Sequence, residues 1–508
     1  MKLQLTSAIA LASAASASWT QNINYHSPSE HHPSLGISIH KVVKRNDLKS
    51  PWDPVKLNLT RGVASGDPYP NSVILWTRVG PSSDNGKSNV TVEGTAPLYS
   101  HETGEYVAAS KAPVCVEYKV YKDKKLGNVV DSVKIYTSSD IDYTVKVEAK
   151  NLKPYTKYYY QFNVCNSNNK SPAGRTKTTP NADDGVTKVG IAIYSGSNYP
   201  FGFFNAYGNT VRKDSVDYVF PWIPVWDDHE VADNTYRDGM SELNNTEQSF
   251  VHNGGVAVGQ HKMNAVRAYF EWIPIPQRTF SIGKLIGLVM PDTHQYDRSI
   301  TDLYWNTDYI HEISNDAWDG YMSNKNRTLQ HLYNNNINNN NNNIFLSGDS
   351  HASWVSDLMW LENKPYDPTT GAGSIGVEFG GSAVTSPCPY GANISLATAN
   401  NYSAILQTAN PELQWQGLYY RGYYEPHLSK KEMSANYFGM PTVVNRDGWE
   451  ISLAKFTVKA GANKLQRPVA GGKVESGSLK GGKTVQANAT ADTGSGKWFV
   501  SHEKLEVL

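Results

Sequence analysis

The spacing of apolar residues changes along the chain, and the spacing predicts the kind of element that each stretch forms. Between about residues 57 and 179, short runs alternate apolar and polar residues or are wholly apolar, with turns rich in Gly, Asn, Ser and Pro between them; the runs are SVILWTRV, CVEYKVYKD, YTVKVEAKNL and KYYYQFNVC. This pattern predicts β-strands, and helical periodicity is absent from the region.

Several short strands at close spacing predict an antiparallel β-sandwich over residues 57–180, similar to a fibronectin type III or immunoglobulin-like module. From Lys188 the pattern becomes typical of an α/β fold, because KVGIAIYS is a continuous apolar run and a Gly- and Asn-rich loop follows it. Near-helical spacing predicts a helix over VGQHKMNAVRAYFEW, and Pro274 ends it soon after. The chain is therefore predicted to be multidomain, β-rich and α/β, with its α/β domain over residues 187–460.

The stretch DSVDYVFPWIPVWDDHEVADN, residues 214–234, reads as two buried strands placed end to end. A parallel pair of strands needs a crossover of roughly a dozen residues or more, and about four are present here. We therefore expect that one of the two runs leaves the sheet or that both merge into one strand.

Two segments have the composition of poorly structured sequence. NNNINNNNNN, residues 334–343, is typical of an expanded surface loop. After about Ala460 the chain consists mainly of Gly, Lys, Ser and Thr until WFVSHEKLEVL, so we expect a low-complexity C-terminal tail over residues 461–508 that is mostly disordered over residues 460–495.

Length and charge narrow the classes of function. At 508 residues the chain is long enough for two or three domains. Lys and Arg together number 47, as do Asp and Glu, so no field of one sign attracts nucleic acid or an acidic membrane surface. No stretch after the N-terminus is long and apolar enough to span a bilayer. We expect no nucleic-acid partner and no membrane span.

The first residues, MKLQLTSAIALASAASASW, are typical of a secretory signal peptide over residues 1–18, with a pro-segment or linker over residues 19–56. We expect the protein to be secreted or held at the cell wall, with a vacuole as the other destination. Eight sequons fit N-glycans on this route; they begin at Asn58, Asn89, Asn169, Asn244, Asn326, Asn393, Asn401 and Asn488. Cys115 and Cys165 either pair, which leaves Cys388 free, or remain buried thiols.

Hard metal ligands follow directly after apolar strands. VWDDHEVADN and IFLSGDSHASW carry Asp227, Asp228, His229, Glu230, Asp233, Asp349 and His351. Carboxylates and imidazoles that converge from separate strand ends are what a site for divalent or trivalent cations needs. LVMPDTHQYDR adds Asp292 and Arg298, and a guanidinium can bind a phosphate through two hydrogen bonds. Each stretch alone is typical of a solvated acidic loop, whereas together they predict a metal hydrolase.

Five stretches together resemble the alkaline phosphatase D (PhoD) family in its fungal form, in family order and over residues 57–460. They are GVASGDPYPNSVILWTRV, SNYPFGFFNAYGN, WDDHEVADNTYRDG, DTHQYDRSITDLYWN and LSGDSHASWVSDL. The resemblance implies an N-terminal β-sandwich and a metallophosphatase-type α/β domain with a central β-sandwich flanked by helices. It also implies hydrolysis of small phosphomonoesters or phosphodiesters with iron and calcium as cofactors.

The resemblance assigns roles to individual residues. Asp228 and His229 stand where related metallophosphatases have Asn-His, which implies a metal ligand and a catalytic general acid. Asp349 and His351 are further metal ligands by the same resemblance. The candidate substrate-binding residues are Asn198, Asp292 and Arg298.

The chain also departs from the family pattern. The family's first strand ends in a motif resembling Ser-Cys-Ser-Asn, whose cysteine binds iron, and here the stretch is Ser195-Gly196-Ser197-Asn198. A Gly-Asp-Tyr motif, whose aspartate bridges the metals, is missing between Val219 and Phe220, and Asp292-Thr293-His294 stands where the family has Asp-Thr-Arg. SNDAWDGYMSNKNRT is shortened as well. The α/β domain is therefore expected to be incomplete.

These departures leave two functions open. The first is a metal-dependent phosphoric ester hydrolase whose activity is impaired, with a single calcium or zinc ion held weakly by Asp228, Asp349 and His351. The alternative is a catalytically inactive relative that binds phosphate or glycans outside the cell. A mis-spliced gene model would explain the deletions, but it would not explain the Cys-to-Gly and Arg-to-His replacements.

Overall fold

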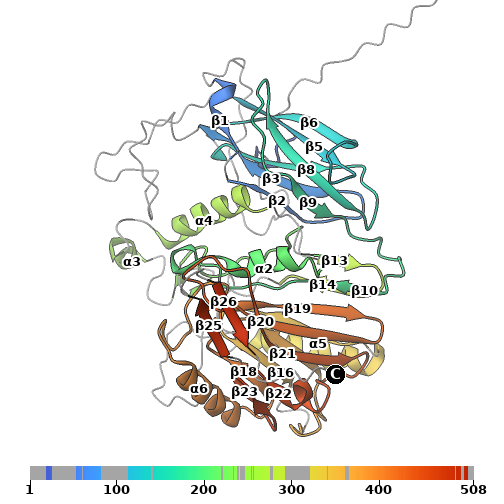
Figure 1. Ribbon diagram of the computed structural model, residues 1–508, viewed down its shortest axis with the longest axis vertical. Coiled ribbons are helices and arrows are strands. Elements are labelled where there is room, and N and C mark those ends of the chain that lie inside the picture. The colour runs from blue at the N-terminus through green and yellow to red at the C-terminus, as the bar shows by residue number, and fades with distance from the viewer. Residues whose placement is uncertain are drawn as a thin grey trace, which may run out of the picture. The chain divides into compact units, whose positions relative to one another are not determined.

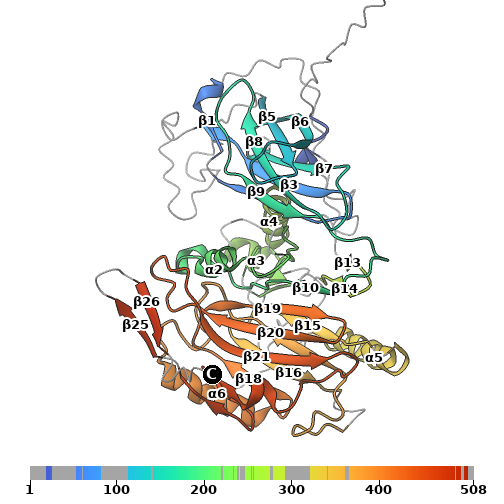
Figure 2. The same ribbon diagram turned by 45° about the vertical axis from the view of Figure 1, so that its right-hand side comes forward.

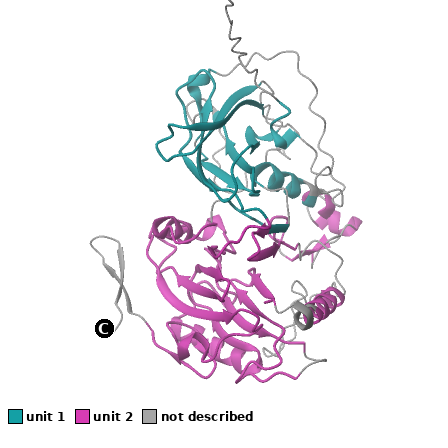
Figure 3. Ribbon diagram, turned by 90° about the vertical axis from the view of Figure 1, so that its right-hand side faces the viewer, with its two compact units in different colours: residues 1–181, 220–225, 262–280 teal, residues 182–219, 226–261, 281–508 magenta. Residues whose placement is uncertain are grey.

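The computed structural model divides the chain into two compact units (Figure 3). Unit 1 contains residues 1–181, 220–225 and 262–280, and unit 2 contains residues 182–219, 226–261 and 281–508. The structure describes residues 19–25, 53–59, 61–81, 113–138, 141–218, 221–232, 234–236, 239–240, 246–252, 255, 257–274, 279–291, 321–339, 341–360, 365–486, 488–492 and 497–501.

Unit 1 is a β-sandwich (Figure 1). Its strands are β1 (Leu57–Asn58), β2 (Val63–Gly66), β3 (Val73–Arg78), β4 (Gly80–Pro81), β5 (Val114–Tyr121), β6 (Val129–Thr137), β7 (Thr144–Ala149), β8 (Lys157–Val164) and β9 (Gly174–Lys177). The antiparallel sheets β2-β3-β7 and β6-β5-β8-β9 share one hydrophobic core, in which Leu75 and Val147 of the first sheet join Val116 and Phe162 of the second. Three of the predicted strand runs contain β3, β7 and β8, and the fourth covers β5 except for its first residue, Val114.

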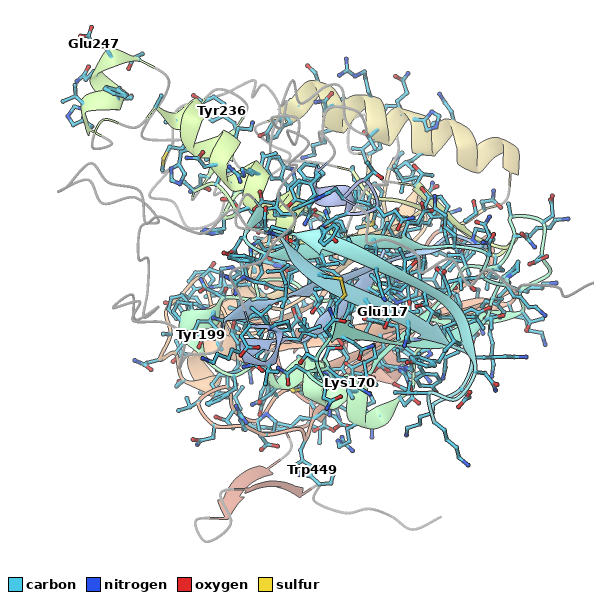
Figure 4. All side chains as sticks on the ribbon, turned by 90° about the horizontal axis from the view of Figure 1, so that it is seen from above. Glu117, Lys170, Tyr199, Tyr236, Glu247 and Trp449 are labelled. Carbon is cyan, nitrogen blue, oxygen red and sulfur yellow. A yellow bond between two sulfur atoms is a disulfide. The ribbon has the colours of Figure 1, made fainter. Side chains whose placement is uncertain are left out.

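A disulfide joins Cys115 on β5 to Cys165 directly after β8. Figure 4 shows it as a yellow bond near Glu117. Cys388 is free and buried. The first of the two cysteine arrangements that the sequence left open is therefore the one observed.

Two further segments are built into unit 1 by buried polar contacts. The helix α4 (Val258–Trp272) has the bounds of the predicted helix, and its part from Lys262 onward belongs to unit 1. The carbonyl oxygen of Glu271 accepts hydrogen bonds from Trp76 Nε1 and Asn24 Nδ2, both at 2.8 Å. Asn24 lies in the 3-10 helix η1 (Ile23–Tyr25), and a second 3-10 helix, η3 (Pro54–Lys56), precedes β1. The end of α4 is thus capped by side chains of the sandwich and of the segment before it.

Unit 2 is built around a second β-sandwich. One sheet has the order β10-β19-β20-β21 and the other β15-β17-β16-β18-β23. Their strands are β10 (Lys188–Gly190), β15 (Ile344–Ser347), β16 (Ser353–Leu358), β17 (Gly376–Gly380), β18 (Leu413–Gly417), β19 (Gly422–Ser429), β20 (Glu432–Gly439), β21 (Ile451–Lys459) and β23 (Ser478–Leu479). Trp415 of β18 packs 5.0 Å from Tyr437 of β20 and 5.3 Å from Phe456 of β21, measured between ring centroids, so the two sheets share a core.

Helices flank the sandwich of unit 2. The helix α6 (Leu396–Ala409) packs on β18 and β23, and Figure 2 shows it beside β18. Its Gln407 Nε2 donates to the carbonyl oxygens of Gln414 and Ser478. The helix α2 (Asn205–Lys213) lies against β19, and Asn209 accepts a 2.6 Å hydrogen bond from the Tyr423 hydroxyl. The remaining helices and strands are α3 (Glu247–His252), α5 (Met322–Asn339), η6 (Tyr199–Phe201), η8 (Val469–Gly472), β11 (Thr235–Tyr236), β12 (Gly239–Met240), β13 (Thr279–Ile282), β14 (Ile286–Val289), β22 (Lys473–Val474), β24 (Lys483–Thr484), β25 (Asn488–Asp492) and β26 (Lys497–Ser501).

The two apolar runs of residues 214–234 pair with different units. Tyr218 forms an isolated parallel bridge with Ile191 in unit 2, and Trp222 forms one with Gly66 in unit 1. Neither run extends into a strand ladder among the described residues. The two runs therefore do not merge into one strand. The second run pairs apart from the first, which is one of the two outcomes that the missing crossover allows.

Two composition-based predictions were wrong. The helix α5 continues to Asn339, so the Asn-rich stretch from residue 334 is helical over its first part rather than a surface loop. Residues 461–486 are part of unit 2 rather than a disordered tail, because Leu465, Val469, Val474 and Leu479 are buried in its core. These four apolar side chains anchor the segment in the core, although the average composition around them is polar. Among the described residues, no helix has both the length and the apolar character needed to cross a membrane.

Candidate metal and phosphate site

Three carboxylates gather in unit 2. Oxygen atoms of Asp227, Asp228 and Asp349 all lie within 4.8 Å of one another. Asp228 is 2% exposed, and one of its carboxylate oxygens accepts a hydrogen bond from the backbone N–H of Asn234. Negative charges at this separation repel one another, and a cation placed among them would remove that cost.

The backbone around Asp228 holds this carboxylate in place. The N–H groups of Val231 and Ala232 donate to the Asp228 carbonyl oxygen at 2.9 and 3.0 Å, and the Thr235 hydroxyl donates to it at 3.1 Å. The WDDHE stretch therefore enters a turn rather than continuing as a strand. Consecutive residues in such a turn can point to the same side, which brings Asp227 and Asp228 to one group.

Asp349 and His351 follow β15 in a tight, left-handed turn. Their φ angles are 66° and 54°, a region that costs about 1–3 kcal/mol for residues other than glycine. The backbone N–H of Asp349 donates to Ser195 Oγ at 2.8 Å, and Trp354 Nε1 donates to Ser350 Oγ at 2.7 Å. These side-chain contacts fix a backbone conformation that the turn alone would not favour.

The turn at Gly196 lies against the turn that carries His351. Ser195 forms a parallel bridge with Ala383, and the Val384 N–H donates to the Ser195 carbonyl oxygen at 2.8 Å. Gly196 has a φ angle of 53°, and an ideal Cβ at this position would lie 3.1 Å from His351 Cδ2. Gly196, where the resemblance implies a metal-binding cysteine, therefore lies within the candidate site.

Asn198, a predicted substrate-binding residue, is anchored next to this turn. Its N–H donates to Thr385 Oγ1 at 2.8 Å, and the Thr385 hydroxyl donates to the Asn198 carbonyl oxygen at 2.7 Å. Both contacts use the backbone of Asn198. The loop leads to Tyr199, whose side chain is 85% exposed and lies at the edge of the molecule in Figure 4.

The surroundings of the His351 imidazole favour its neutral form. Burial is the main reason that its pKa lies below the usual value of 6.5, and electrostatic interactions with Arg421 and His229 lower the pKa further. The negative charge of Asp227 acts in the opposite direction. These interactions show that His351, His229 and Asp227 share one electrostatic environment, and a neutral imidazole is the form that binds metals.

The structure brings some of the predicted site residues together, and others lie outside the described residues. Asp228 and Asp349 lie together as predicted metal ligands would, His351 is beside them, and His229 is exposed next to Asp228. Asp227, which belonged to the acidic stretch but not to the predicted ligand set, completes the group of carboxylates. The predicted substrate-binding residues Asp292 and Arg298 lie outside the described residues.

A buried arginine is part of the same region and carried no signal in the sequence. Arg421 lies between β18 and β19 and is 8% exposed. Its Nη1 atom donates to the carbonyl oxygens of His351 and Ser386 at 2.8 and 2.9 Å. The surrounding stretch LYYRGYYEPH gave no reason to connect it with the acidic motifs.

The donor set fits one hard divalent cation better than an iron and calcium pair. Three carboxylates with a neutral imidazole nearby suit calcium or another divalent ion. The resemblance implies a cysteine thiolate at position 196 for an iron ion, and this residue is glycine here. Position 196 therefore offers no thiolate for a second cation.

Comparisons with known proteins agree on one family. The PhoD-like phosphatase N-terminal domain matches residues 46–180, and the PhoD-like phosphatase domain matches residues 218–312 and 304–437. Alkaline phosphatase D of Bacillus subtilis (strain 168) is 25% identical over an alignment of 586 positions, which covers 93% of this chain and 91% of that protein. This alignment is longer than the 508-residue chain, so it includes positions at which this chain has no residue.

The fold agrees with this relationship. A solved structure described as "Structure of PhoD" has a TM-score of 0.63 and 23% sequence identity, and the match covers 86% of this chain and 95% of that one. The match shows the same β-rich architecture. The chain belongs to the PhoD-like phosphatase family and is by family a phosphoric ester hydrolase.

Proposed function

We propose that this chain is a metal-dependent phosphoesterase of reduced activity that acts on small phosphomonoesters or phosphodiesters with a single divalent cation. The observation that supports this proposal best is the group formed by Asp227, Asp228 and Asp349 beside neutral His351. When bound there, the cation would supply Lewis-acid polarisation of a phosphoryl oxygen. The carboxylates bind and orient the cation, and without one they would repel an anionic substrate.

The protein's own acid is proposed to be His229. Its side chain is exposed and follows Asp228 directly, so it can reach a substrate at the mouth of the carboxylate group. In hydrolysis a water molecule would form a new P–O bond while the P–O bond to the leaving group breaks, and His229 would pass a proton to the leaving alkoxide. Reduced activity is supported by Gly196, because no thiolate is available to hold a second metal.

The test of this function combines metal analysis with turnover. The purified chain is dialysed against calcium, manganese or zinc and its bound metal is measured. Release of nitrophenol from p-nitrophenyl phosphate and bis(p-nitrophenyl) phosphate is then followed. We expect about one cation per chain and slow, cation-dependent turnover that is lost in Asp228→Asn. Stoichiometric iron with rapid turnover would contradict the proposal of a reduced site.

A second candidate function is binding without hydrolysis. It is favoured by the replacement at Gly196 and by a carboxylate group that could retain a cation and an anion without activating a nucleophile. Calorimetric binding of inorganic phosphate in the presence of calcium, with no nitrophenol release from either ester, would distinguish this function from slow catalysis.

We infer further that the protein is secreted, held at the cell wall or delivered to a vacuole, with N-glycans on some of its sequons. Asn326, Asn393 and Asn401 are exposed. Asn169 Nδ2 instead donates to the carbonyl oxygens of Val55 and Leu57, both at 2.7 Å, and a glycan on this nitrogen would remove at least one of these bonds. Peptide mapping after deglycosylation tests this distribution.

Unit 1 is proposed to be a fibronectin- or immunoglobulin-like module, which its two antiparallel sheets support.

A further inference from the structure

The buried guanidinium of Arg421 is bonded to carbonyl oxygens. Nη1 donates to His351 and Ser386, and Nη2 donates to Leu418. No carboxylate of the described residues forms an ion pair with Arg421. A buried charge is costly unless strong interactions compensate it. Hydrogen bonds to these carbonyl oxygens compensate the charge of Arg421, so the oxygens are held close to the guanidinium.

Those contacts connect the two turns that form the site. His351 belongs to the left-handed turn that also carries Asp349. Ser386 in turn donates to the Gly196 carbonyl oxygen with both its N–H and its hydroxyl, each at 3.1 Å. Through Ser386, one guanidinium therefore links the turn after β15 with the turn at Gly196.

The planar guanidinium suits this task better than any other cationic side chain. Its N–H groups diverge in a fixed plane, so it can donate to several carbonyl oxygens at once. A lysine ammonium is a single point at the end of a flexible chain and would not hold both His351 and Leu418 in place.

We propose that Arg421 is a positioning residue of this site: it holds the Asp349–His351 turn against the Gly196 turn, so that Asp349 completes the carboxylate group that binds the cation. An effect of Arg421 on catalysis rests on the proposed function. The positioning role does not require turnover for its detection, because the position of a turn and the affinity for a cation can be measured directly.

Arg467 provides a matched control. It is also a mostly buried arginine of unit 2 that donates to carbonyl oxygens, those of Leu465 and Pro368, but its partner is the buried Asp357. Arg467→Lys should lower the melting temperature as Arg421→Lys does, without affecting the cation site. Ser386→Ala is a milder change in the proposed link, because it removes the hydroxyl contact with Gly196 and leaves Arg421 in place.

The experiment compares the full chain with Arg421→Lys, Ser386→Ala and Arg467→Lys. Hydrogen exchange at the Asp349 amide, which is bonded to Ser195 Oγ, reports the turn without any metal. We expect exchange to accelerate at least tenfold in Arg421→Lys and about threefold in Ser386→Ala, with no change in Arg467→Lys. Calorimetric calcium affinity should fall in the same order, and the KM for bis(p-nitrophenyl) phosphate should rise more than kcat falls.

Two outcomes would overturn the positioning role. One is unchanged exchange at Asp349 in both Arg421→Lys and Ser386→Ala. The other is an equal acceleration in Arg467→Lys at the same loss of melting temperature, which would reduce Arg421 to a general contribution to stability. A wild-type chain that binds calcium but hydrolyses neither ester would contradict the proposed catalysis, while the exchange data would still decide the role of Arg421.

Discussion

Gly196 and His351 lie so close that an ideal Cβ on the glycine would be 3.1 Å from His351 Cδ2. The same Cβ would lie 2.6 Å from the Cβ of Ala383, a distance that real Cβ atoms essentially never show. Position 196 is thus part of the candidate site but is closed to any side chain. The backbone at position 196 leaves no room for a cysteine side chain.

We therefore predict that Gly196→Cys destabilises unit 2 and does not by itself create a metal ligand. The left-handed φ of 53° and the contact with Ala383 together should lower the free energy of unfolding by on the order of 1–3 kcal/mol. Adding Ala383→Gly should recover the part that is due to the contact. Chemical unfolding measures both effects, and a thiolate-to-cobalt absorption band would report a ligand in the double variant.

Gly448→Cys is the control for this series, because a Cβ at Gly448 would meet no heavy atom within 4 Å. It should change stability by no more than a few tenths of a kcal/mol. If Gly196→Cys is as stable as Gly448→Cys, the turn is not closed in the way that the structure indicates.

The fold could be predicted wherever the pattern was local. Strand alternation identified β3, β5, β7 and β8, and apolar spacing identified α4 with its bounds. The segment after residue 460 could not be recognised, because Leu465 and Leu479 are single apolar residues in polar surroundings and their burial depends on strands distant in sequence. Composition averages over a window and misses such isolated anchors.

The candidate site could be predicted only in part, because the sequence pattern reveals local features alone. Asp228 and Asp349 stand directly after apolar runs, and that position is readable from the chain. Asp227 lies with Asp228 and Asp349 because the backbone turns after Asp228, and no periodicity in the sequence reveals this turn. Arg421 acts through carbonyl oxygens of segments that lie 35 and 70 residues away, so no motif could connect it with the site.

Replacing one carboxylate should have opposite effects on stability with and without a cation. Asp349→Asn keeps a residue that tolerates the left-handed turn and removes one of three mutually repelling charges. In chelator the variant should be at least as stable as the wild type. Calcium at a hundred times its dissociation constant should raise wild-type stability by about 2.7 kcal/mol, and the variant should need at least tenfold more calcium.

Thermal unfolding across a calcium titration measures this difference. Asp214→Asn is the matched control, because Asp214 is another aspartate in the left-handed region, with a φ of 47°, at the end of α2. An equal loss of calcium response in both variants would show that the carboxylate group is not the cation site.

The disulfide of unit 1 should contribute strongly to the stability of that unit. It closes a loop of 50 residues between Cys115 and Cys165, which restricts the unfolded chain, so the double substitution to serine should cost roughly 2–4 kcal/mol. Hydrogen exchange in β5 and β8 measures the effect in unit 1. Exchange in β20 of unit 2 serves as the internal reference, and equal changes in both units would indicate a general unfolding effect instead.

Buried Lys146 on β7 should make the stability of unit 1 depend on pH above neutrality. Its side chain is 2% exposed, and its Nζ donates to the Phe270 carbonyl oxygen at the end of α4. Burial lowers its pKa from 10.5 to about 7, although the charges of Glu271 and Asp67 act in the opposite direction. Between these two pKa values the unfolded chain retains a proton that the folded chain has lost.

The free energy of unfolding of unit 1 should consequently rise with pH from about 7 toward 10, by up to about 1.4 kcal/mol per pH unit, while the full penalty remains below pH 7. Lys146→Met removes the titrating group and should flatten this slope. Lys150→Met, at an exposed lysine directly after β7, should leave it unchanged. Urea unfolding of the three proteins at pH 7 and pH 9, followed by hydrogen exchange in β7, measures the slopes. A slope that survives in Lys146→Met would have to come from another group, because the only ionisable atom that the substitution removes is Nζ of Lys146.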